Sequence, residues 1–334
     1  MPVSIKDIAR LAGVSHSTVS RALRDSPLIP AVTAQRIQQI ARESGYTASA
    51  VARSLVTRKT QAIGVVVTSI ADPFNGDVVD GMEEVANEGG YSVILATSQA
   101  DPGREVTVVR SFGERRVDGI VVASSRVGSL YLPLLQELKI PIVLINNQRG
   151  GDFIHSIAFD NVHGAYQAAR HLLELGHRRI AYLGDRLGLH SDHDRLAGFQ
   201  QALSEFGLPW REQWVVHGDG KLEGAAVAAR TLLGSGERPT GVVCYNDMSA
   251  LGLLEAAEKE KIAVPDALSV TGFDDIFCAA LARPALTTVR QPRREMGREA
   301  MRILLTLVSG ASAENAVVIR GDLIVRGSTA PPQI

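Results

Sequence analysis

Polar side chains follow several apolar, β-prone segments at the point where each segment ends. They are Asp72 after 62–68, Asn146 after 141–145, Asp160 after 157–159, Asn246 and Asp247 after 241–245, and Asp274 and Asp275 after 269–273, while Phe74 also follows 62–68. Arg195 opens a further segment with a helical pattern. Carboxylates and amides accept or bridge hydrogen bonds, and arginine presents a planar fork of donors. Phe74 adds an apolar face for a ring, so the set suits a ligand rich in hydroxyl groups.

Each of these residues also has a purely structural interpretation. Asp and Asn are common at helix starts and in turns, whatever the function. For any one residue the two interpretations stay open. Six such positions at one edge favour a binding site.

Apolar runs alternate with helical patterns along 61–334 and must position these residues. Strands are expected at 62–68, 91–97, 118–123, 141–145, 179–183, 214–216, 241–245 and 269–273, and helices at 75–88, 103–114, 129–138, 164–175, 195–206, 223–233 and 247–260. This order is typical of parallel sheets with crossover helices. The pattern restarts after Asp160, which predicts two α/β lobes that meet at the carboxyl ends of their strands. A helix over 294–307 and a strand over 317–325 follow both lobes, so the chain is expected to cross between them more than once.

The first sixty residues form a separate, basic segment. They hold nine Lys or Arg and three acidic residues, a net charge of +6, whereas the remainder holds 26 basic and 33 acidic residues, a net charge of −7. A basic end favours a polyanionic partner. A solvated surface is the other interpretation of the charge alone.

The same segment has the spacing of a helix-turn-helix. Ser4 can start a first helix, Gly13 can end it, and Ser15 can cap a second helix with Val19, Ala22 and Leu23 inward. The exposed side of the second helix carries His16, Ser17, Thr18, Ser20 and Arg21. A helix of this kind can enter the major groove, where arginine bridges the O6 and N7 atoms of guanine.

Two more helices are expected in the basic segment. One runs from about Val32 to Ser44, with Gly45 as its stop and Tyr46 packed back on the other helices. The other is short, at 49–55, with Val51 and Leu55 on one side. Alone it would be marginal in water, so it needs a second copy, DNA or both as a partner. A linker that favours helix is the alternative.

Composition excludes several classes of protein. No apolar stretch approaches the roughly 20 residues of a membrane helix, and the start of the chain lacks the pattern of a secretion signal. The two cysteines, Cys244 and Cys278, exclude a disulfide framework and a four-cysteine zinc site. We therefore expect a cytoplasmic protein without membrane contact.

Catalytic and cofactor signals are incomplete. The Gly-Asp-Gly-Lys run at 218–221 lacks the Ser or Thr of a phosphate loop, because Leu222 follows it. No Gly-x-Ser-x-Gly elbow is present. One cluster could bind a metal, but its place just before Arg195 favours a ligand-site rim or a solvated loop: His190, Asp192, His193 and Asp194. We expect no enzyme, no cofactor and no metal.

Several blocks resemble the lactose-repressor family of bacterial transcription regulators. Residues 5–9 (Ile-Lys-Asp-Ile-Ala), 13–23 (Gly-Val-Ser-His-Ser-Thr-Val-Ser-Arg-Ala-Leu) and 52–55 (Ala-Arg-Ser-Leu) carry the resemblance in order and spacing. It continues at 72–74 (Asp-Pro-Phe), 195–199 (Arg-Leu-Ala-Gly-Phe), 246–247 (Asn-Asp) and 272–275 (Gly-Phe-Asp-Asp). In relatives, and in periplasmic sugar-binding proteins, these later blocks touch the ligand.

The resemblance implies the organisation of the whole chain. Residues 1–47 would form an all-α helix-turn-helix headpiece, and 48–60 a hinge helix and linker. Residues 61–334 would form a two-lobed α/β effector-binding and dimerisation domain with parallel sheets, like the periplasmic binding proteins. The lobe nearer the hinge would hold about 61–159 and 291–320, and the other about 160–290 and 321–334.

The resemblance also implies site residues. DNA would be contacted by His16, Ser17, Thr18, Arg21, Ala52 and Leu55, with Leu55 as a wedge in the central base step. The effector would be contacted by Asp72, Phe74, Asn146, Ser191, Asp192, Arg195, Asn246 and Asp274. Three departures stand out: Ala48-Ser49 replaces Pro-Asn at the hinge, Pro30-Ala31 replaces a Ser-like cap, and Gly220 stands where relatives often have an aromatic residue.

The sequence thus predicts a homodimeric DNA-binding regulator, most simply a repressor, acting on a pseudopalindromic operator. A small polar metabolite, a sugar or sugar derivative, would bind between the lobes and control operator affinity. A transport-type solute-binding protein is an alternative, but it would need a signal peptide and no basic headpiece. An α/β enzyme would need a nucleophile, an acid–base pair or a cofactor loop.

Overall fold

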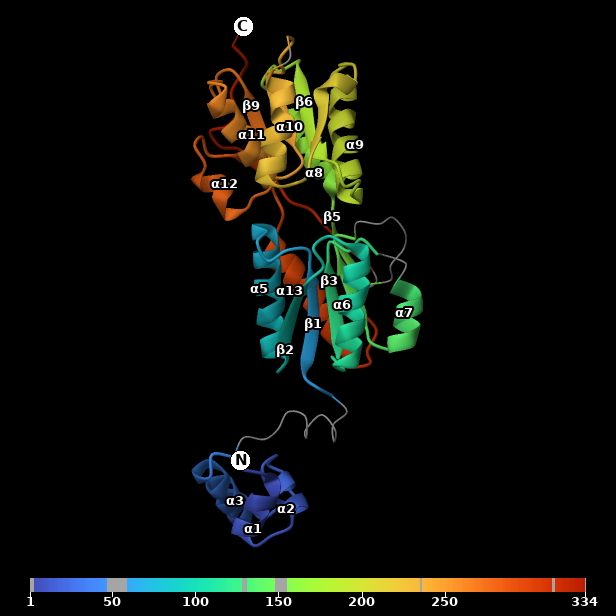
Figure 1. Ribbon diagram of the computed structural model, residues 1–334, viewed down its shortest axis with the longest axis vertical. Coiled ribbons are helices and arrows are strands. Elements are labelled where there is room, and N and C mark those ends of the chain that lie inside the picture. The colour runs from blue at the N-terminus through green and yellow to red at the C-terminus, as the bar shows by residue number, and fades with distance from the viewer. Residues whose placement is uncertain are drawn as a thin grey trace. The chain divides into compact units, whose positions relative to one another are not determined.

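The chain divides into two units, Met1–Gln61 and Ala62–Ile334, which are drawn in Figure 1. The computed structural model describes residues 3–46, 59–127, 131–147, 155–234, 236–313 and 316–333. The predicted hinge helix at 49–55, with Ala52 and Leu55, lies outside the described residues.

The described part of the first unit contains α1 (Ile5–Ala12), α2 (His16–Ala22) and α3 (Ala31–Glu43). Ser4 begins α1, because its N–H and its hydroxyl both donate to the Asp7 carboxylate, at 3.0 and 2.6 Å. The Ser15 hydroxyl accepts from the N–H of Thr18 at 3.1 Å and caps α2, as predicted. The core of the unit consists of Ile8, Ala9, Ala12, Val19, Ala22, Ile37 and Ala41, with Tyr46 packed against it as predicted.

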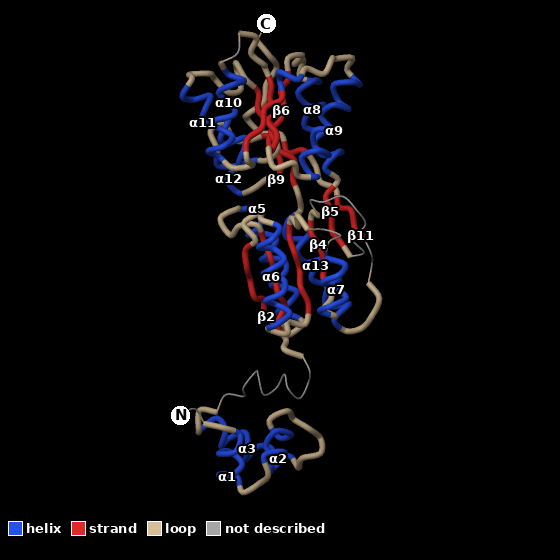
Figure 2. The backbone as a smooth tube through the Cα atoms, turned by 45° about the vertical axis from the view of Figure 1, so that its right-hand side comes forward, coloured by secondary structure: helices blue, strands red, loops and turns tan. Residues whose placement is uncertain are grey.

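The second unit contains two six-stranded sheets, each the core of one lobe (Figures 1 and 2). In lobe N the sheet order is β11 (Ala316–Ile319), β5 (Ser156–Phe159), β4 (Ile142–Ile145), β3 (Gly119–Ala123), β1 (Ala62–Val67) and β2 (Ser92–Thr97), all parallel. One face is covered by α5 (Pro73–Glu88) and α13 (Arg293–Val308), and the other by α6 (Pro102–Glu114) and α7 (Tyr131–Leu138).

Lobe C has the same layout. Its order is β12 (Leu323–Ile324), β10 (Thr287–Arg290), β9 (Ser269–Asp274), β8 (Gly241–Cys244), β6 (Ile180–Asp185) and β7 (Val215–Gly218), with β12 alone antiparallel to its neighbour. One face is covered by α8 (Asn161–Glu174) and α9 (His190–Glu205), and the other by α10 (Leu222–Leu233), α11 (Asp247–Lys259) and the short α12 (Phe277–Leu281). The two-lobed parallel α/β fold predicted from the sequence is confirmed.

Two predicted elements were wrong in detail. The single strand predicted at 317–325 is two strands: β11 pairs with β5 in lobe N and β12 pairs with β10 in lobe C, so the chain changes sheets at Arg320-Gly321-Asp322. The helix predicted from Arg195 begins five residues earlier, at His190. Leu189 precedes it and has no capping side chain, so the sequence carries no start signal there. In the described residues the chain passes between the lobes three times, after β5, after β10 and after β11.

A close crossing of α5 and α13 holds one face of lobe N together. A Cβ atom on Gly297 would lie 2.0 Å from the carbonyl oxygen of Val78, and one on Gly81 would lie 2.0 Å from that of Arg294. Only glycine at both positions lets the two backbones approach this closely, and the neighbouring Val78, Met82 and Met296 are then fully buried.

Candidate functional site

The carboxyl ends of the strands in both lobes border a cavity of about 470 Å³ within the second unit. Parallel strands place the residues that follow them at one edge of each sheet, so the cavity is lined by loops and helix starts. The lining comprises Thr68, Ser69, Asp72, Gln99, Ala100, Ser124 and Arg126 from lobe N, and Asp185, Leu187, Leu189, Asp219, Gly220, Lys221, Tyr245 and Asn246 from lobe C.

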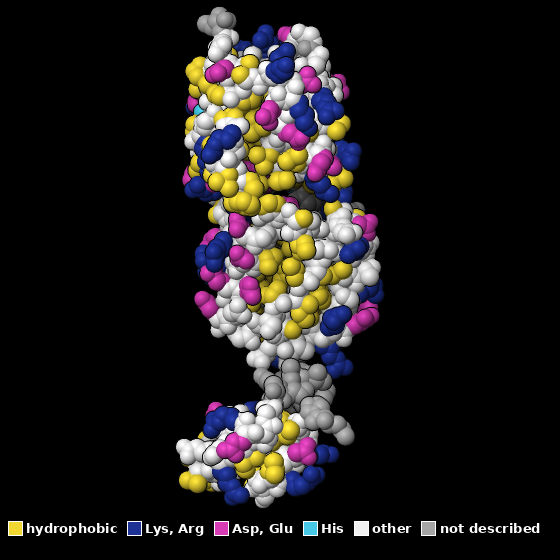
Figure 3. Space-filling model, turned by 60° about the vertical axis from the view of Figure 1, so that its left-hand side comes forward, with side chains coloured by type: hydrophobic (Ala, Val, Ile, Leu, Met, Phe, Trp, Pro, Cys, Tyr) yellow, Lys and Arg dark blue, Asp and Glu magenta, His cyan; other side chains and the backbone are white. Residues whose placement is uncertain are grey.

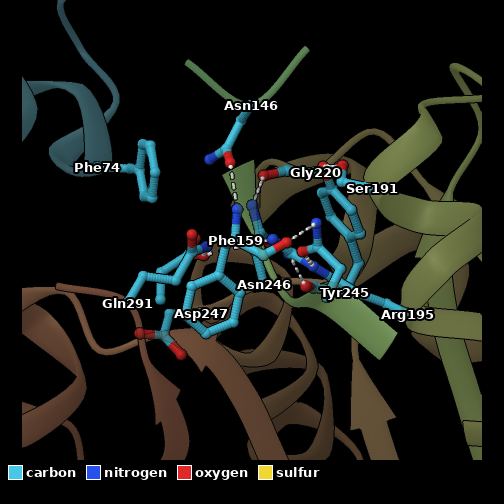
Figure 4. Close-up of polar contacts among 12 residues, drawn as sticks. Phe74, Asn146, Phe159, Ser191, Arg195, Gly220, Tyr245, Asn246, Asp247 and Gln291 are labelled. Carbon is cyan, nitrogen blue, oxygen red and sulfur yellow. Dashed lines mark hydrogen bonds and ion pairs between the residues drawn. The ribbon is translucent and has the colours of Figure 1, made fainter. Parts of the chain in front are cut away.

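A smaller cavity of about 60 Å³ adjoins the first and shares four of its lining residues, Asp72, Ser124, Tyr245 and Asn246. It adds Phe74, Asn146, Ser191, Arg195, Asp274 and Gln291. The two cavities, called the cleft from here on, therefore bring together seven of the eight residues proposed as effector contacts. Figure 4 shows several of them converging from both lobes.

Arg195 is the most firmly fixed donor in the cleft. Its Nε donates to Oδ1 of Asn161 at 2.9 Å and its Nη1 donates to the Tyr245 carbonyl oxygen at 2.5 Å. Its Nη2 lies 3.8 Å from Oδ1 of Asp274, and its Cζ lies 3.7 Å from the centroid of the Phe273 ring. The guanidinium is buried and already in place, so a ligand need not order it on binding.

Asp274 is a buried carboxylate at the end of β9. The Nε2 of Gln291 donates to its Oδ1 at 2.6 Å. Burial raises the pKa of Asp274 to about 6, against the opposing effect of the Arg195 guanidinium, and the Asp72 carboxylate adds to the rise. Its φ of 114° is uncommon for a residue with a side chain, and such strain concentrates at functional sites.

Several cleft residues are helix caps and lining residues at once. Oδ1 of Asp72 accepts from the N–H of Phe74 at 3.0 Å and starts α5. Oδ1 of Asn246 accepts from the N–H of Ser249 at 2.8 Å and starts α11, while its Nδ2 donates to the Gly220 carbonyl oxygen at 3.0 Å. The structural and functional interpretations of these residues therefore do not exclude one another.

Ser191 and Asp192 take different directions from the first turn of α9. The Ser191 hydroxyl lies 2.9 Å from the Tyr245 hydroxyl, and both residues line the cleft. Asp192 is not in the lining. Its Oδ1 accepts from the Tyr182 hydroxyl at 2.8 Å and from the N–H of Asp185 at 3.1 Å, so it positions the end of β6.

Gly220 lines the cleft at the position where relatives often carry an aromatic residue. Its φ is +70°, which side chains rarely adopt. A Cβ atom would also lie 3.0 Å from Oδ2 of Asp185 and 3.5 Å from the Tyr245 ring. The loop is thus built for glycine, and the edge of the Tyr245 ring lies beside it.

Sequence reasoning missed ten polar lining residues: Thr68, Ser69, Gln99, Ser124, Arg126, Asp185, Asp219, Lys221, Tyr245 and Gln291. Ser124, Tyr245 and Gln291 directly follow β3, β8 and β10, so the same strand-end rule would have found them. Arg126 had no such signal. Its Nη1 donates to the Ala100 carbonyl oxygen at 2.9 Å, and its Nη2 donates to that of Leu187 in the other lobe at 3.1 Å.

The first unit presents the predicted polar surface of α2. His16, Ser17 and Arg21 are exposed, whereas Thr18 is half-buried, with its hydroxyl 2.8 Å from that of Ser15. Three side chains of α2 are thus available to a partner, while Thr18 helps to hold the start of the helix.

Among the described residues, no helix is long and apolar enough to span a membrane. Residues 4–49 match the family model described as "Bacterial regulatory proteins, lacI family", and residues 169–329 match the model of a periplasmic binding protein-like domain.

Relatives match along nearly the whole chain. The chain is 33% identical over 327 residues to the HTH-type transcriptional repressor PurR of Photobacterium profundum, covering 97% of this chain and 98% of that protein. It is 34% identical over 335 residues to the HTH-type transcriptional regulator DegA of Bacillus subtilis, covering 99% of both.

Solved structures also match along nearly the whole chain. A lac repressor dimer bound to operator and the anti-inducer ONPF superimposes with a TM-score of 0.90 at 26% identity, covering 99% of this chain and 100% of that one. A complex of the transcriptional regulator CelR with cellobiose gives a TM-score of 0.74 at 28% identity, covering 98% and 99%.

Proposed function

Because the chain belongs to the lacI family of bacterial regulatory proteins, we propose that it is a transcriptional repressor that binds a specific DNA operator under the control of a small polar effector. The effector occupies the cleft between the lobes, and α2 of the first unit reads the operator. The observation that carries the proposal is the buried Arg195, preset by three polar partners at a cavity that residues of both lobes line.

The effector class that fits the cleft best is a sugar or sugar derivative. The lining is dominated by hydroxyl, carboxylate, amide and guanidinium groups, which match a ligand with many hydroxyls. Phe74 and Tyr245 offer apolar faces for one ring. The similar CelR structure, which holds cellobiose, supports this class.

The regulator acts as a homodimer. One small headpiece reads only a few base pairs, so specificity calls for two copies on a pseudopalindromic operator. Exposed apolar side chains on the second unit suit such a contact: Ile94 and Leu95 of β2, and Phe277 and Leu281 of α12. Figure 3 shows hydrophobic side chains gathered on one face of both lobes. The similar lac repressor structure is a dimer on its operator.

Control follows from the two-lobed architecture. An effector that contacts both lobes favours one angle between them, because its contacts are complete in only one arrangement. It shifts the DNA-competent population by the difference between its affinities for the two arrangements. The residues predicted as the hinge, 48–60, would transmit the change to the headpiece.

DNA reading is tested by Arg21→Ala. The variant should lose about 1–3 kcal/mol of operator affinity, because a bidentate arginine–guanine contact is worth this much, and should lose discrimination among duplexes. Gel shifts on operators selected in vitro, repeated over a salt series, measure both effects. Arg110→Ala removes the same charge from the second unit and should bind like the parent. Equal operator affinity in Arg21→Ala would contradict the assignment.

Effector binding should depend on pH through Asp274. A sugar hydroxyl donates more strongly to an ionised carboxylate than to a protonated one. Since the pKa of Asp274 is about 6, the ionised fraction rises with pH through that value. A ligand that requires the ionised form gains about tenfold in affinity from pH 5 to pH 7.

Calorimetric titration with the strongest ligand from a thermal-shift screen of sugars measures this dependence. The pH profile of Asp274→Asn should be flat over the same range. A tenfold rise that persists in the variant would place the titrating group elsewhere.

A further inference from the structure

A second cavity lies at the end of lobe C opposite the cleft. It has a volume of about 200 Å³ and is bordered by the amino end of β6, the carboxyl-terminal half of α9 and the connection from α9 to β7. Figure 1 shows α9 running alongside β6 in this lobe. Phe199 and Leu203 of α9 face this cavity, whereas Ser191 and Arg195 on the first turns of the same helix face the cleft. The two sites are therefore separate.

Aromatic side chains form one wall of this distal cavity. The Trp210 and Phe199 rings lie edge to face with centroids 6.3 Å apart, and Trp214, which also lines the cavity, is only 7% exposed. Trp210 remains 41% exposed, which is high for so large an apolar side chain. Rings arranged in this way suit an inserted planar ring, because aromatic groups prefer edge-to-face and offset contacts.

Arginines form the rim. Arg178, Arg179 and Arg211 line the cavity, and among the described lining residues none is acidic. Arg211 is paired with Glu237 at 3.2 Å and lies over the Trp214 ring at 4.6 Å. Arg178 donates to the carbonyl oxygens of Leu173 and His177.

Arg179 differs from the other two. Its guanidinium has no hydrogen bond or ion pair within the part of the chain that the structure describes. Its backbone is nevertheless fixed, since the N–H groups of Thr240 and Gly241 donate to its carbonyl oxygen at 2.8 and 3.2 Å. The rim thus offers one guanidinium without a partner among the described residues, and a carboxylate is the group that such a planar fork of donors binds with two hydrogen bonds.

We propose that the distal cavity binds a single-ring aromatic carboxylate, with the ring among Phe199, Trp210 and Trp214 and the carboxylate on Arg179. The volume supports one ring, because it is below the roughly 300 Å³ at which pockets for larger ligands begin. The net positive rim favours an anion over a neutral ring. This site is independent of the effector cleft and of DNA binding.

Intrinsic tryptophan fluorescence can detect binding at this site, because Trp210 and Trp214 are the two tryptophans of the chain. Tryptophan fluorescence of the full chain is titrated with three probes. Benzoate supplies both ring and charge, benzamide supplies the ring without the charge, and cyclohexanecarboxylate supplies the charge without an aromatic ring. Benzoate should change the fluorescence to saturation, and each of the other two should bind at least fivefold more weakly.

Variants assign the response to the cavity. Arg179→Gln should weaken benzoate at least fivefold and leave benzamide unchanged, and since Arg179 is exposed the variant keeps the fold. Arg230→Gln, an exposed arginine of α10 outside the lining, should bind benzoate like the parent. Arg195→Ala should also leave the benzoate titration unchanged. The proposal is overturned if benzoate gives no saturable signal, if the three probes bind equally, if Arg179→Gln binds benzoate like the parent, or if Arg195→Ala abolishes the signal.

Discussion

Replacing Arg195 by alanine is expected to abolish the response to the effector while operator binding persists. The guanidinium is one of the few donors in the cleft that is buried and fixed before a ligand arrives. Hydrogen bonds from a charged group are worth about 1.5–3 kcal/mol each, so the loss of a two-pronged contact lowers effector affinity by about 100-fold or more. Calorimetric titration gives the affinity, and gel shifts with and without effector give the response.

The control for this prediction is Arg230→Ala, which removes an exposed arginine from α10 in the same lobe. Its effector affinity should match that of the parent. Operator affinity within about twofold of the parent shows that Arg195→Ala is folded. An unchanged effector response in Arg195→Ala would remove this residue from the site, and with it the main support for the proposed ligand position.

Gly297→Ala is expected to destabilise lobe N strongly. The new Cβ would lie 2.0 Å from the Val78 carbonyl oxygen, a backbone atom that cannot rotate away. The α5 and α13 helices must separate, which opens the packing around Met82 and Met296. Overpacking of this kind costs about 3 kcal/mol. The urea midpoint of the circular dichroism transition measures the loss.

Gly76→Ala is the matched control, on the partner helix α5. A Cβ at Gly76 would meet nothing within 4 Å, and the residue is exposed. Alanine is the better helix former, so this variant should be more stable by about 0.5–1 kcal/mol. Equal stability of Gly297→Ala and the parent would mean that the helix crossing is looser than the 2.0 Å approach implies.

The strand-end rule explains why so much of the cleft could be predicted. Parallel strands bring Asp72, Asn146, Asn246 and Asp274 to one region wherever the helices lie, so the sequence order was enough. The family resemblance was confirmed by matches along nearly the whole chain. Tyr245 was missed because it was assigned to the end of a buried strand, although it is the first residue beyond β8.

The sequence did not predict that the Asp192 side chain points to the end of β6 and not into the cleft. The start of α9 carries no side-chain cap, so the sequence gives no signal for a helix at His190. With that start known, the spacing of four between Ser191 and Arg195 places them on one helical face, and Asp192 falls on another. The split of residues 317–325 into two strands does have a signal in the sequence, because the turn-prone Gly321 and Asp322 lie between its two apolar runs.

Because the chain passes between the lobes three times, lobe N is completed only late in translation. The headpiece emerges first, but lobe N lacks α13 and its edge strand β11 until residues 293–319 have been translated. A message cut short before that point would encode a product with helices α1 to α3 and an apolar sheet face left bare. Such truncated products would expose apolar surface that favours aggregation, and quality-control proteases would be expected to remove them.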